Sequence, residues 1–336
     1  MALLEIEDLS IAFDTRQGRV TAVDGLSLSL EPGETLGLVG ESGSGKSLTS
    51  LAILGLLPSN ATSQAKRLAF DRRELSQMSA EERRSLRGGN IAMIFQDPMT
   101  SLNPSFTVGF QLKEVLRLHA DGPRKQRHRQ SIEILERVGI SDAESRLEAF
   151  PHQLSGGMCQ RVMIAMAMAS RPRLLIADEP TTALDVTIQA QILSLLSELQ
   201  REEKMAMILI THDIAIVSEN SDRIAVMYAG EIVETGSTED VLREPRHPYT
   251  AGLLNCLPAN VKHLAPKERL PTLSGLVPSL AHRPKGCQFH PRCKAALAHC
   301  RESSPLSTID GGRQFRCHYP QPPNRKEGAA HELSLA

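Results

Sequence analysis

The chain has 336 residues and an almost balanced charge, with 38 basic and 39 acidic side chains and a formal net charge of -1 at pH 7. That length is enough for one large domain and an appended region, and the balanced charge gives no support to a nucleic-acid partner. The N-terminus lacks the features of a signal peptide, and no apolar run approaches the roughly 20 residues that span a membrane. We therefore expect a soluble protein of the reducing cytosol, where structural disulfides are disfavoured.

The first 40 residues alternate apolar and polar positions, which predicts short β-strands with a turn at Pro32 and Gly33. A helical pattern follows from residue 46 to residue 57. Further along the chain, three short apolar runs are typical of strands buried on both faces, at residues 90–96, 174–178 and 206–212. The sequence therefore predicts an α/β fold with an antiparallel part at its N-terminal end.

Helical stretches are expected between residues 108 and 170, and a hairpin is expected over residues 223–236 with its turn at Ala229 and Gly230. Beyond residues 245–250 the composition shifts toward proline, histidine and cysteine. This change predicts a domain boundary there. The last dozen residues are typical of a disordered tail.

The stretch GESGSGKS follows an apolar strand and opens the first predicted helix. It fits the pattern G-x-x-x-x-G-K-[ST], in which backbone N–H groups surround phosphate oxygens at a helix N-terminus. The lysine of this pattern contacts the β- and γ-phosphates, and the hydroxyl that follows binds Mg²⁺. The candidate nucleotide-binding residues are Gly40, Ser42, Gly43, Gly45, Lys46 and Ser47.

A second motif, LLIADEP, is an apolar strand that ends in two carboxylates, Asp178 and Glu179. At the rim of a parallel sheet, Asp178 is placed to hold the metal or its water ligand. Glu179 is placed to polarise an attacking water. The two motifs together predict a nucleotide hydrolase.

The stretch LSGGMCQR lies where a loop leads into a helix, so that Ser155 can cap the helix and Gly156 and Gly157 can bring N–H groups close to an anion. It resembles the signature motif of ABC ATPases. The resemblance implies a RecA-like P-loop core with an antiparallel β subdomain and a helical signature subdomain. It also implies that two ATPase subunits enclose ATP, each signature contacting the nucleotide held by the other subunit.

Other motifs of the ABC family follow in the expected order. Gln96 resembles the glutamine that senses Mg²⁺ and contacts the membrane partner, and Asp185 resembles the D-loop residue at the dimer interface. His212 resembles the switch histidine that contacts the γ-phosphate. Phe13 matches the aromatic residue that stacks on adenine, and a core position is the alternative for it. The resemblance implies catalytic roles for Glu179, His212 and Gln96, and Mg²⁺ ligation by Ser47 and Gln96.

Three stretches, QDPMTSLNPSF, RHPYTAGLLNCLP and GCQFHPRC, resemble the ATP-binding subunits of dipeptide, oligopeptide and nickel importers. The resemblance implies an ATPase on the cytoplasmic face of the inner membrane. Its partners would be two permease subunits, a similar ATPase that forms a heterodimer with it, and a periplasmic binding protein that delivers substrate. Peptide is the expected substrate, with nickel, glutathione and haem as alternatives, and no nucleic acid is expected. An ABC ATPase of nucleic-acid metabolism is the rival class, but it needs two motif sets.

On this resemblance the chain divides into an ATPase domain over residues 1–248, with a helical subdomain over about 98–172, and an extension over residues 249–322. A disordered tail over residues 323–336 is expected to follow. Four cysteines of the extension lie close together, with a spacing that does not suit a zinc knuckle: Cys287, Cys293, Cys300 and Cys317. Members of the resembled family hold a 4Fe-4S cluster here, so we expect a cluster, with zinc or unligated thiols as alternatives.

Overall fold

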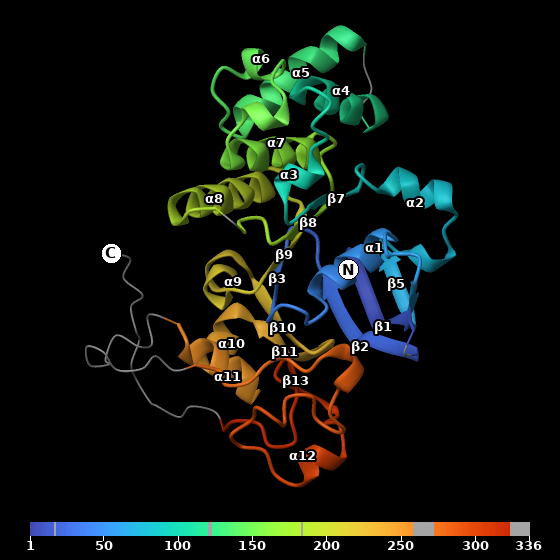
Figure 1. Cartoon of the computed structure of the whole chain (residues 1–336), viewed down its shortest axis with the longest axis vertical. Helices are drawn as coiled ribbons and strands as arrows, with labels where there is room; N and C mark the ends of the chain where they lie inside the picture. Colours follow the sequence, from blue (N-terminus) through green and yellow to red (C-terminus); the bar gives the residue numbers. More distant parts are fainter. Residues whose placement is uncertain (17, 120–122, 183, 258–271, 323–336) are drawn as a thin grey trace, which may run out of the picture.

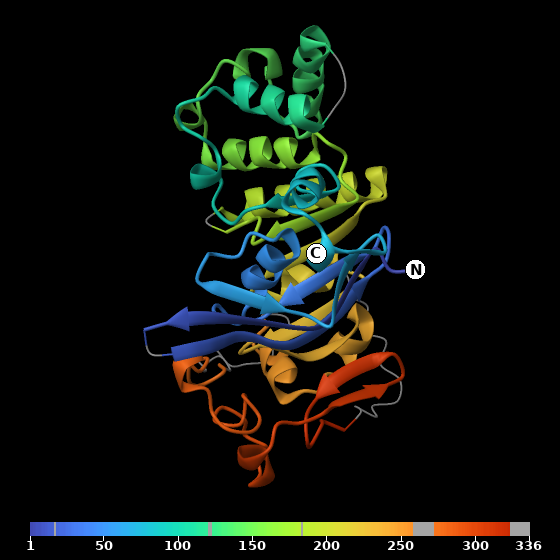
Figure 2. The ribbon, with the colours of Figure 1, turned by 90° about the vertical axis from the view of Figure 1, so that its right-hand side faces the viewer.

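The computed structural model describes residues 1–16, 18–119, 123–182, 184–257 and 272–322 (Figure 1). A central sheet separates a group of helices at one end of the molecule from the C-terminal residues at the other. The N-terminal strands lie beside this sheet, as Figure 2 shows from the right-hand side. The tail expected at residues 323–336 lies outside the described residues.

The central sheet has eight strands in the order β12-β13-β11-β10-β3-β9-β8-β7. The five strands from β10 to β7 are parallel, whereas β11, β13 and β12 add antiparallel pairs at one edge. The strands are β3 (Thr35–Val39), β7 (Ile91–Ile94), β8 (Leu174–Asp178), β9 (Ala206–Thr211), β10 (Arg223–Tyr228), β11 (Glu231–Ser237), β12 (Ser307–Asp310) and β13 (Arg313–Arg316). The three buried strands predicted from apolar runs are confirmed as β7, β8 and β9.

The second sheet is antiparallel and five-stranded, with the order β2-β1-β5-β6 and with β4 paired to β1. Leu4 of β1 lies opposite Leu30 of β2 on one side and Phe70 of β5 on the other. The strands are β1 (Leu4–Thr15), β2 (Gly18–Leu30), β4 (Ala61–Gln64), β5 (Arg67–Phe70) and β6 (Arg73–Glu74). This sheet confirms the predicted antiparallel part.

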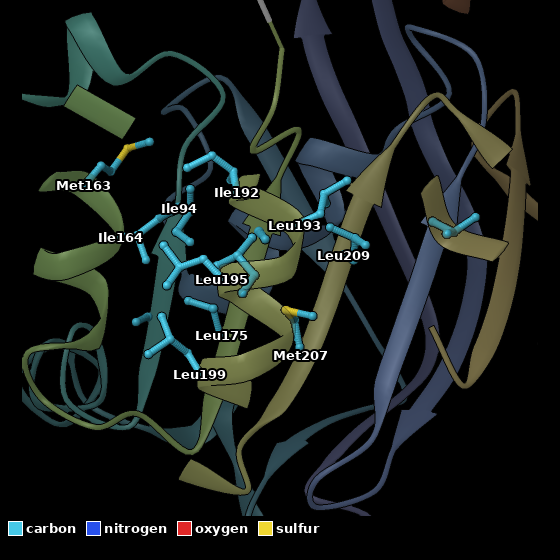
Figure 3. Close-up of a cluster of buried hydrophobic side chains, with 14 of the residues drawn as sticks. Ile94, Met163, Ile164, Leu175, Ile192, Leu193, Leu195, Leu199, Met207 and Leu209 are labelled. Atoms are coloured by element: carbon cyan, nitrogen blue, oxygen red, sulfur yellow. The ribbon is translucent and has the colours of Figure 1, made fainter. Parts of the chain in front are cut away.

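Alternate side chains of the central strands enter two different cores. In β8, Leu174 and Ile176 pack with helix α1 (Lys46–Leu54) and the antiparallel sheet. Leu175 and Ala177 face the other core, which contains α8 (Val186–Glu203). Figure 3 shows the second core, where side chains of α7 and α8 meet those of β7, β8 and β9. Burial on both faces explains why these strands are continuous apolar runs.

Between β7 and β8 the chain forms a helical region that lies at the top of Figure 1. Its elements are α3 (Pro98–Ser101), α4 (Val108–His119), α5 (Arg124–Arg137), α6 (Ala143–Arg146), η2 (Pro151–Gln153) and α7 (Gly156–Met168). Apolar residues of α4, α5 and α7 pack into the same core as the central sheet. The helical region is therefore anchored to the strands that precede and follow it.

The remaining elements connect or cover the sheets. They are η1 (Leu75–Gln77), α2 (Ala80–Leu86), α9 (Ile214–Asn220), α10 (Thr238–Arg243), α11 (Pro248–Asn255), η4 (Leu280–His282) and α12 (His299–Glu302). None of the helices in the described ranges is long and apolar enough to cross a membrane. Helix α1 is shorter than predicted because Gly55 adopts a left-handed conformation and caps it after Leu54.

The hairpin between β10 and β11 turns at Ala229 and Gly230, as predicted, and both residues have positive φ angles of 46° and 87°. Such a two-residue turn matches the twist of the strands. A Cβ atom at Gly230 would lie 2.3 Å from the carbonyl oxygen of Ala22, so only glycine fits there. The turn thereby brings the hairpin against β2.

The C-terminal residues are joined to the central sheet by β13, in which Phe315 lies opposite Glu234 of β11. The Arg313 guanidinium forms an ion pair of 3.1 Å with Glu234, whose side chain is fully buried. The extension therefore shares a sheet with the preceding residues. The predicted division between residues 248 and 249 stays a prediction.

Candidate functional site

The loop over residues 40–47 connects β3 to α1 and contains the predicted phosphate-binding residues. Gly45 stands at the N-cap of α1 with a φ of 103°, a conformation that favours glycine. The first turn of α1 contains no acidic side chain. Ser42, Gly43 and Ser47 are exposed. The loop therefore offers solvent-accessible backbone at a positive helix end, which is suited to an anion.

Lys46 lies inside this loop, with its side chain folded back over the backbone. Its Nζ atom donates to the carbonyl oxygens of Gly40, at 2.7 Å, and Glu41, at 3.1 Å. The residue is only 5% exposed. Burial lowers the pKa of Lys46, while the nearby carboxylates of Glu179, Asp178 and Glu41 oppose that shift. The ammonium group thus lies between the loop and the carboxylates that end β8.

Asp178 ends β8 beside the loop and is 4% exposed. Burial raises the pKa of Asp178, and a hydrogen bond from Ser47 opposes the shift. Its Oδ1 atom has no hydrogen-bond partner among the described residues. A buried oxygen without a partner, next to a hydroxyl, is a donor set that suits a hard cation such as Mg²⁺.

Glu179 follows directly and has a φ of 46°, which is uncommon for a residue with a side chain. Its carboxylate accepts hydrogen bonds from Gln96 Nε2, at 3.1 Å, and Thr182 Oγ1, at 2.9 Å. The exposed His212 places Nδ1 3.4 Å from Glu179 Oε1. Gln96, Glu179 and His212 were predicted from separate motifs, and the fold brings them together at the carboxyl ends of the parallel strands.

The predicted signature residues occupy the N-terminus of α7, away from the loop. Ser155 Oγ accepts a hydrogen bond of 3.3 Å from the N–H of Met158, and thereby caps α7 as predicted. Gly156 is exposed, and a Cβ atom there would meet nothing within 4 Å. Asp185 caps α8 by accepting a hydrogen bond of 3.0 Å from the N–H of Ile188.

Gly157 of α7 packs closely against Ile188 of α8, so that the two capped helix ends lie side by side. A Cβ atom on Gly157 would lie 3.2 Å from Ile188 Cγ2. In the part of the chain that the structure describes, no hydrogen bond joins residues 154–161 to residues 40–47. The predicted site residues therefore form two groups. One group surrounds the loop and Glu179, and the other comprises Ser155, Gly156, Gly157 and Asp185.

Phe13 lies on β1 opposite Val20, close to the free end of the antiparallel pair. Its half-buried ring packs against the core between the two sheets. This is the core contact that was the alternative to adenine stacking. Part of the ring is exposed, and the role of Phe13 in stacking on adenine stays a prediction.

The prediction of an iron–sulfur cluster or zinc at the four cysteines is wrong. Among the residues that the structure places, no group of three or more histidine, cysteine, aspartate or glutamate side chains could hold a metal ion. The four cysteines line a cavity of about 20 Å³, which is room for about one water molecule.

The thiols that line this cavity are largely withdrawn from water, which disfavours the charged thiolate. Burial raises the pKa of Cys287 and Cys293, and raises that of Cys317 to about 11. These side chains are therefore neutral thiols at pH 7. The cysteines belong to the packing of the extension, and the metal-site interpretation of their sequence pattern fails.

Comparison with known proteins identifies the family. Residues 23–182 match the ABC transporter family, and residues 233–300 match the C-terminal region of oligopeptide/dipeptide transporters. The dipeptide transport ATP-binding protein DppD of Escherichia coli is 54% identical over 321 residues, which cover 95% of this chain and 97% of the relative. This chain is an ATP-binding subunit of the dipeptide/oligopeptide ABC transporter family.

Two other relatives of this family are similarly close. DppD of Haemophilus influenzae is 53% identical over 95% of this chain, and the oligopeptide transport protein OppD of E. coli is 49% identical over 95%. Both are matched over nearly their full length, at 96% and 94%. The likeness therefore includes the C-terminal extension and not only the ATPase part.

Solved structures confirm the ABC cassette fold. The cassette MJ0796, determined as a dimer bound to ADP and phosphate, superposes with a TM-score of 0.62 at 25% identity, over 70% of this chain and 98% of that chain. The cassette cbiO1 of Clostridium perfringens gives a TM-score of 0.60 at 29% identity, over 71% and 90%. The chain is an ABC ATPase, as predicted.

Sequence reasoning missed two residues that contact the site, Thr182 and Arg292. Thr182 hydrogen-bonds Glu179, and its place three residues after that carboxylate was a local signal. Arg292 of the extension pairs with Glu41 inside the loop, from which it is 251 positions away in the sequence. The arginine stands in the stretch GCQFHPRC, which was interpreted only through its cysteines.

Proposed function

We propose that this chain is the ATP-hydrolysing motor subunit of an importer for dipeptides or oligopeptides, and that it works on the cytoplasmic face of the inner membrane. The observation that carries the proposal is the 54% identity to a dipeptide transport ATP-binding protein over 97% of that protein's length. The match to the C-terminal region of oligopeptide/dipeptide transporters supports the peptide assignment.

In this function the loop over residues 40–47 holds the phosphates of ATP. Lys46 gives up its bonds to Gly40 and Glu41 and turns to the β- and γ-phosphates. Ser47, Gln96 and Asp178 would hold Mg²⁺, which when bound supplies positive charge against the phosphate oxygens. The buried Oδ1 atom of Asp178, which has no hydrogen-bond partner in the described residues, supports its role as a Mg²⁺ ligand.

Glu179 accepts the proton of the attacking water, since its carboxylate stands free of any lysine or arginine partner in the described residues. Gln96 and Thr182 both donate to Glu179 Oε2, which orients the carboxylate and leaves Oε1 toward His212. His212 is exposed and adjacent, and so can contact the γ-phosphate. Phe13 would stack on adenine.

The second group of residues would complete the site of another subunit. Ser155, Gly156 and Gly157 form an open helix N-terminus, and Asp185 caps the helix beside it. The dimeric structure of the related cassette MJ0796 supports a two-subunit site. We propose that the partner is a similar ATPase, that two permease subunits form the pore, and that a periplasmic binding protein delivers the peptide.

Replacement of Lys46 by alanine tests the nucleotide site. We expect Lys46→Ala to lose nucleotide binding by about a hundredfold or more, because charge-assisted hydrogen bonds to phosphate are strong. Titration of the full-length chain with a fluorescent ATP analogue measures this. Lys66→Ala, which removes an exposed lysine paired with Glu7, is the matched control and should bind normally. Unchanged affinity in Lys46→Ala would refute the site.

Co-purification tests the importer. The tagged chain, extracted in mild detergent from its own cell, should bring two membrane subunits and a second ATPase with it. Peptide should then stimulate ATP hydrolysis by that complex when the binding protein is present. Recovery of the chain alone, or with nucleic acid, would refute the transport function while leaving the ATPase intact.

A further inference from the structure

The extension reaches back to the phosphate loop through one arginine. Arg292 Nη1 donates to Glu41 Oε1 at 2.8 Å, and the arginine side chain is only 5% exposed. Glu41 is the second residue of the loop that holds Lys46. The contact therefore joins two segments that are far apart in sequence, one of which lies in the nucleotide site.

Several contacts hold Arg292 in this orientation. Its Nε donates to the carbonyl oxygen of Ser274 at 2.9 Å, and its guanidinium lies 5.7 Å from the centre of the Tyr228 ring. Tyr228, Tyr249 and Phe289 form an aromatic cluster with ring centres 4.7 to 5.4 Å apart. Because these contacts fix the guanidinium of Arg292, little side-chain entropy is lost when it forms the ion pair with Glu41.

Glu41 is held at its backbone as well as at its carboxylate. Its N–H donates to Tyr249 Oη at 3.0 Å, while its carbonyl oxygen accepts from Lys46 Nζ at 3.1 Å. Tyr249 and Arg292 both belong to the extension as predicted, over residues 249–322. The extension thus contacts one loop residue twice, at its backbone N–H and at its carboxylate.

A carboxylate in a phosphate-binding loop repels a polyphosphate unless a cation neutralises it. In the described residues Arg292 is the cation that pairs with Glu41. Without it, Glu41 would compete with the phosphates for Lys46, which lies next to it. Arg292 therefore affects both the charge and the shape of the loop.

We propose that Arg292 is a positioning residue of the ATP site, through which the C-terminal extension neutralises Glu41 and holds the phosphate loop ready for ATP. The inference rests on the proposed role of residues 40–47 in binding the phosphates. The extension then contributes to nucleotide binding through an ion pair, and this role requires no metal or cluster. Binding free energies couple reciprocally, so nucleotide must in turn strengthen the docking of the extension.

Substitution of Arg292 by glutamine tests the proposal in the full-length chain. We expect Arg292→Gln to weaken binding of a fluorescent ATP analogue about tenfold, within the usual range of coupling between sites. The loss should shrink as salt rises, because unpaired charge at an exposed loop is screened. In the assembled complex the variant should raise the KM for ATP and change kcat little.

The chain provides a matched control in Arg313, another arginine of the extension with a largely buried side chain. In the described residues it pairs with Glu234 and Glu244, and not with residues 40–47. Arg313→Gln should lower the melting temperature as Arg292→Gln does, yet leave ATP affinity unchanged. Equal loss of affinity in both variants would show that only the general stability of the extension matters, and would overturn the proposal.

A double variant separates charge from packing. Arg292→Gln combined with Glu41→Gln should regain most of the lost affinity, because the repelling carboxylate is gone. Failure of this rescue in a folded double variant would also overturn the proposal. If Lys46→Ala loses binding but Arg292→Gln does not, the site stands and only this inference falls; if Lys46→Ala binds ATP, the proposed site itself falls.

Hydrogen exchange tests the reciprocal effect of nucleotide on the extension. ADP should slow exchange of the backbone amides over residues 274–300 in the full-length chain, and Arg292→Gln should abolish that protection. Protection that is confined to residues 40–47 would contradict the coupling. The measurement distinguishes a positioning residue from one that only stabilises the fold.

Discussion

The two groups of candidate site residues differ in how they are connected. Around the phosphate loop, Lys46, Asp178 and Glu179 influence one another, and Gln96 and His212 contact Glu179 directly. The signature group forms only local helix caps, through Ser155 on α7 and Asp185 on α8. One group is connected through side-chain contacts, whereas the other consists of exposed helix caps.

This difference argues that the chain contains two half-sites rather than one site. Side chains that act on one phosphate need to lie within a few ångströms of it, and in the described structure no hydrogen bond joins residues 154–161 to residues 40–47. Helix starts with open N–H groups bind anions. On the proposed function, the signature group would bind a phosphate that a second subunit brings.

The largest expected effect is that of Glu179→Gln. Loss of the general base should lower ATP hydrolysis by the assembled complex about 10²- to 10⁴-fold. The glutamine keeps the size of the side chain and its bonds to Gln96 and Thr182, so ATP should bind with unchanged affinity and trap the closed dimer. Steady-state phosphate release and ATP titration measure the two effects.

Glu239→Gln is the control for this substitution, since Glu239 is an exposed residue of α10 that pairs with Arg243 and with no other cation in the described residues. Its hydrolysis rate should equal that of the natural chain. Normal turnover by Glu179→Gln in the complex would remove Glu179 from its role and would leave the connected group without a base.

A smaller effect is expected from Ser155→Ala, which tests the second half-site. Loss of one hydrogen bond to a charged phosphate should lower hydrolysis by the assembled complex about tenfold or more. ATP affinity of the isolated chain should stay within about twofold, because its own loop does not contact Ser155. The hydrolysis rate reports on the signature half-site, and the ATP affinity of the isolated chain reports on the loop half-site of the same variant.

Ser155 also caps α7, so the helix should lose about 1 kcal/mol of stability. Ser237→Ala provides the control, because Ser237 caps α10 in the same way by accepting from the N–H of Asp240. It should destabilise the chain by a similar amount and leave hydrolysis unchanged. If Ser155→Ala weakened ATP binding by the isolated chain, the two groups would belong to one site.

The connected half-site was largely predictable from the sequence because each residue stands at the end of a strand. Asp178, Glu179 and His212 follow buried apolar runs, and the carboxyl ends of parallel strands meet at one edge. The left-handed conformation of Glu179 was not predictable, since it depends on its N–H bond to Ile210 on the neighbouring strand.

The extension was the least predictable part, because its function depends on contacts between distant segments. Cys287 and Cys293 drew attention as metal ligands, yet the fold gives them a small cavity and neutral thiols. Arg292 lies next to Cys293 in the sequence but contacts Glu41 in the fold. Periodicity and motif spacing contain no information about such a pair.

The smallest expected effect concerns Asp178 and is measured as stability. Burial raises the native pKa of Asp178 above its unfolded value, so its ionised form is less favourable in the folded chain. The associated stability is present at acid pH and is lost as the pH rises through the native pKa. Removal of the charge should therefore stabilise the nucleotide-free chain at pH 7, whereas it should weaken Mg²⁺-dependent ATP binding.

Asp178→Asn should raise the melting temperature by about 2–4 °C at pH 7, because the neutral amide avoids the cost of burying a charge, here ~1–3 kcal/mol. The gain should fade as the pH is lowered toward 4, because the native carboxyl then protonates. Asp222→Asn is the control, since Asp222 is exposed and accepts a hydrogen bond from the N–H of Thr35, and its melting temperature should not rise. A gain that is independent of pH would mean that packing, and not the buried charge of the loop half-site, limits the stability there.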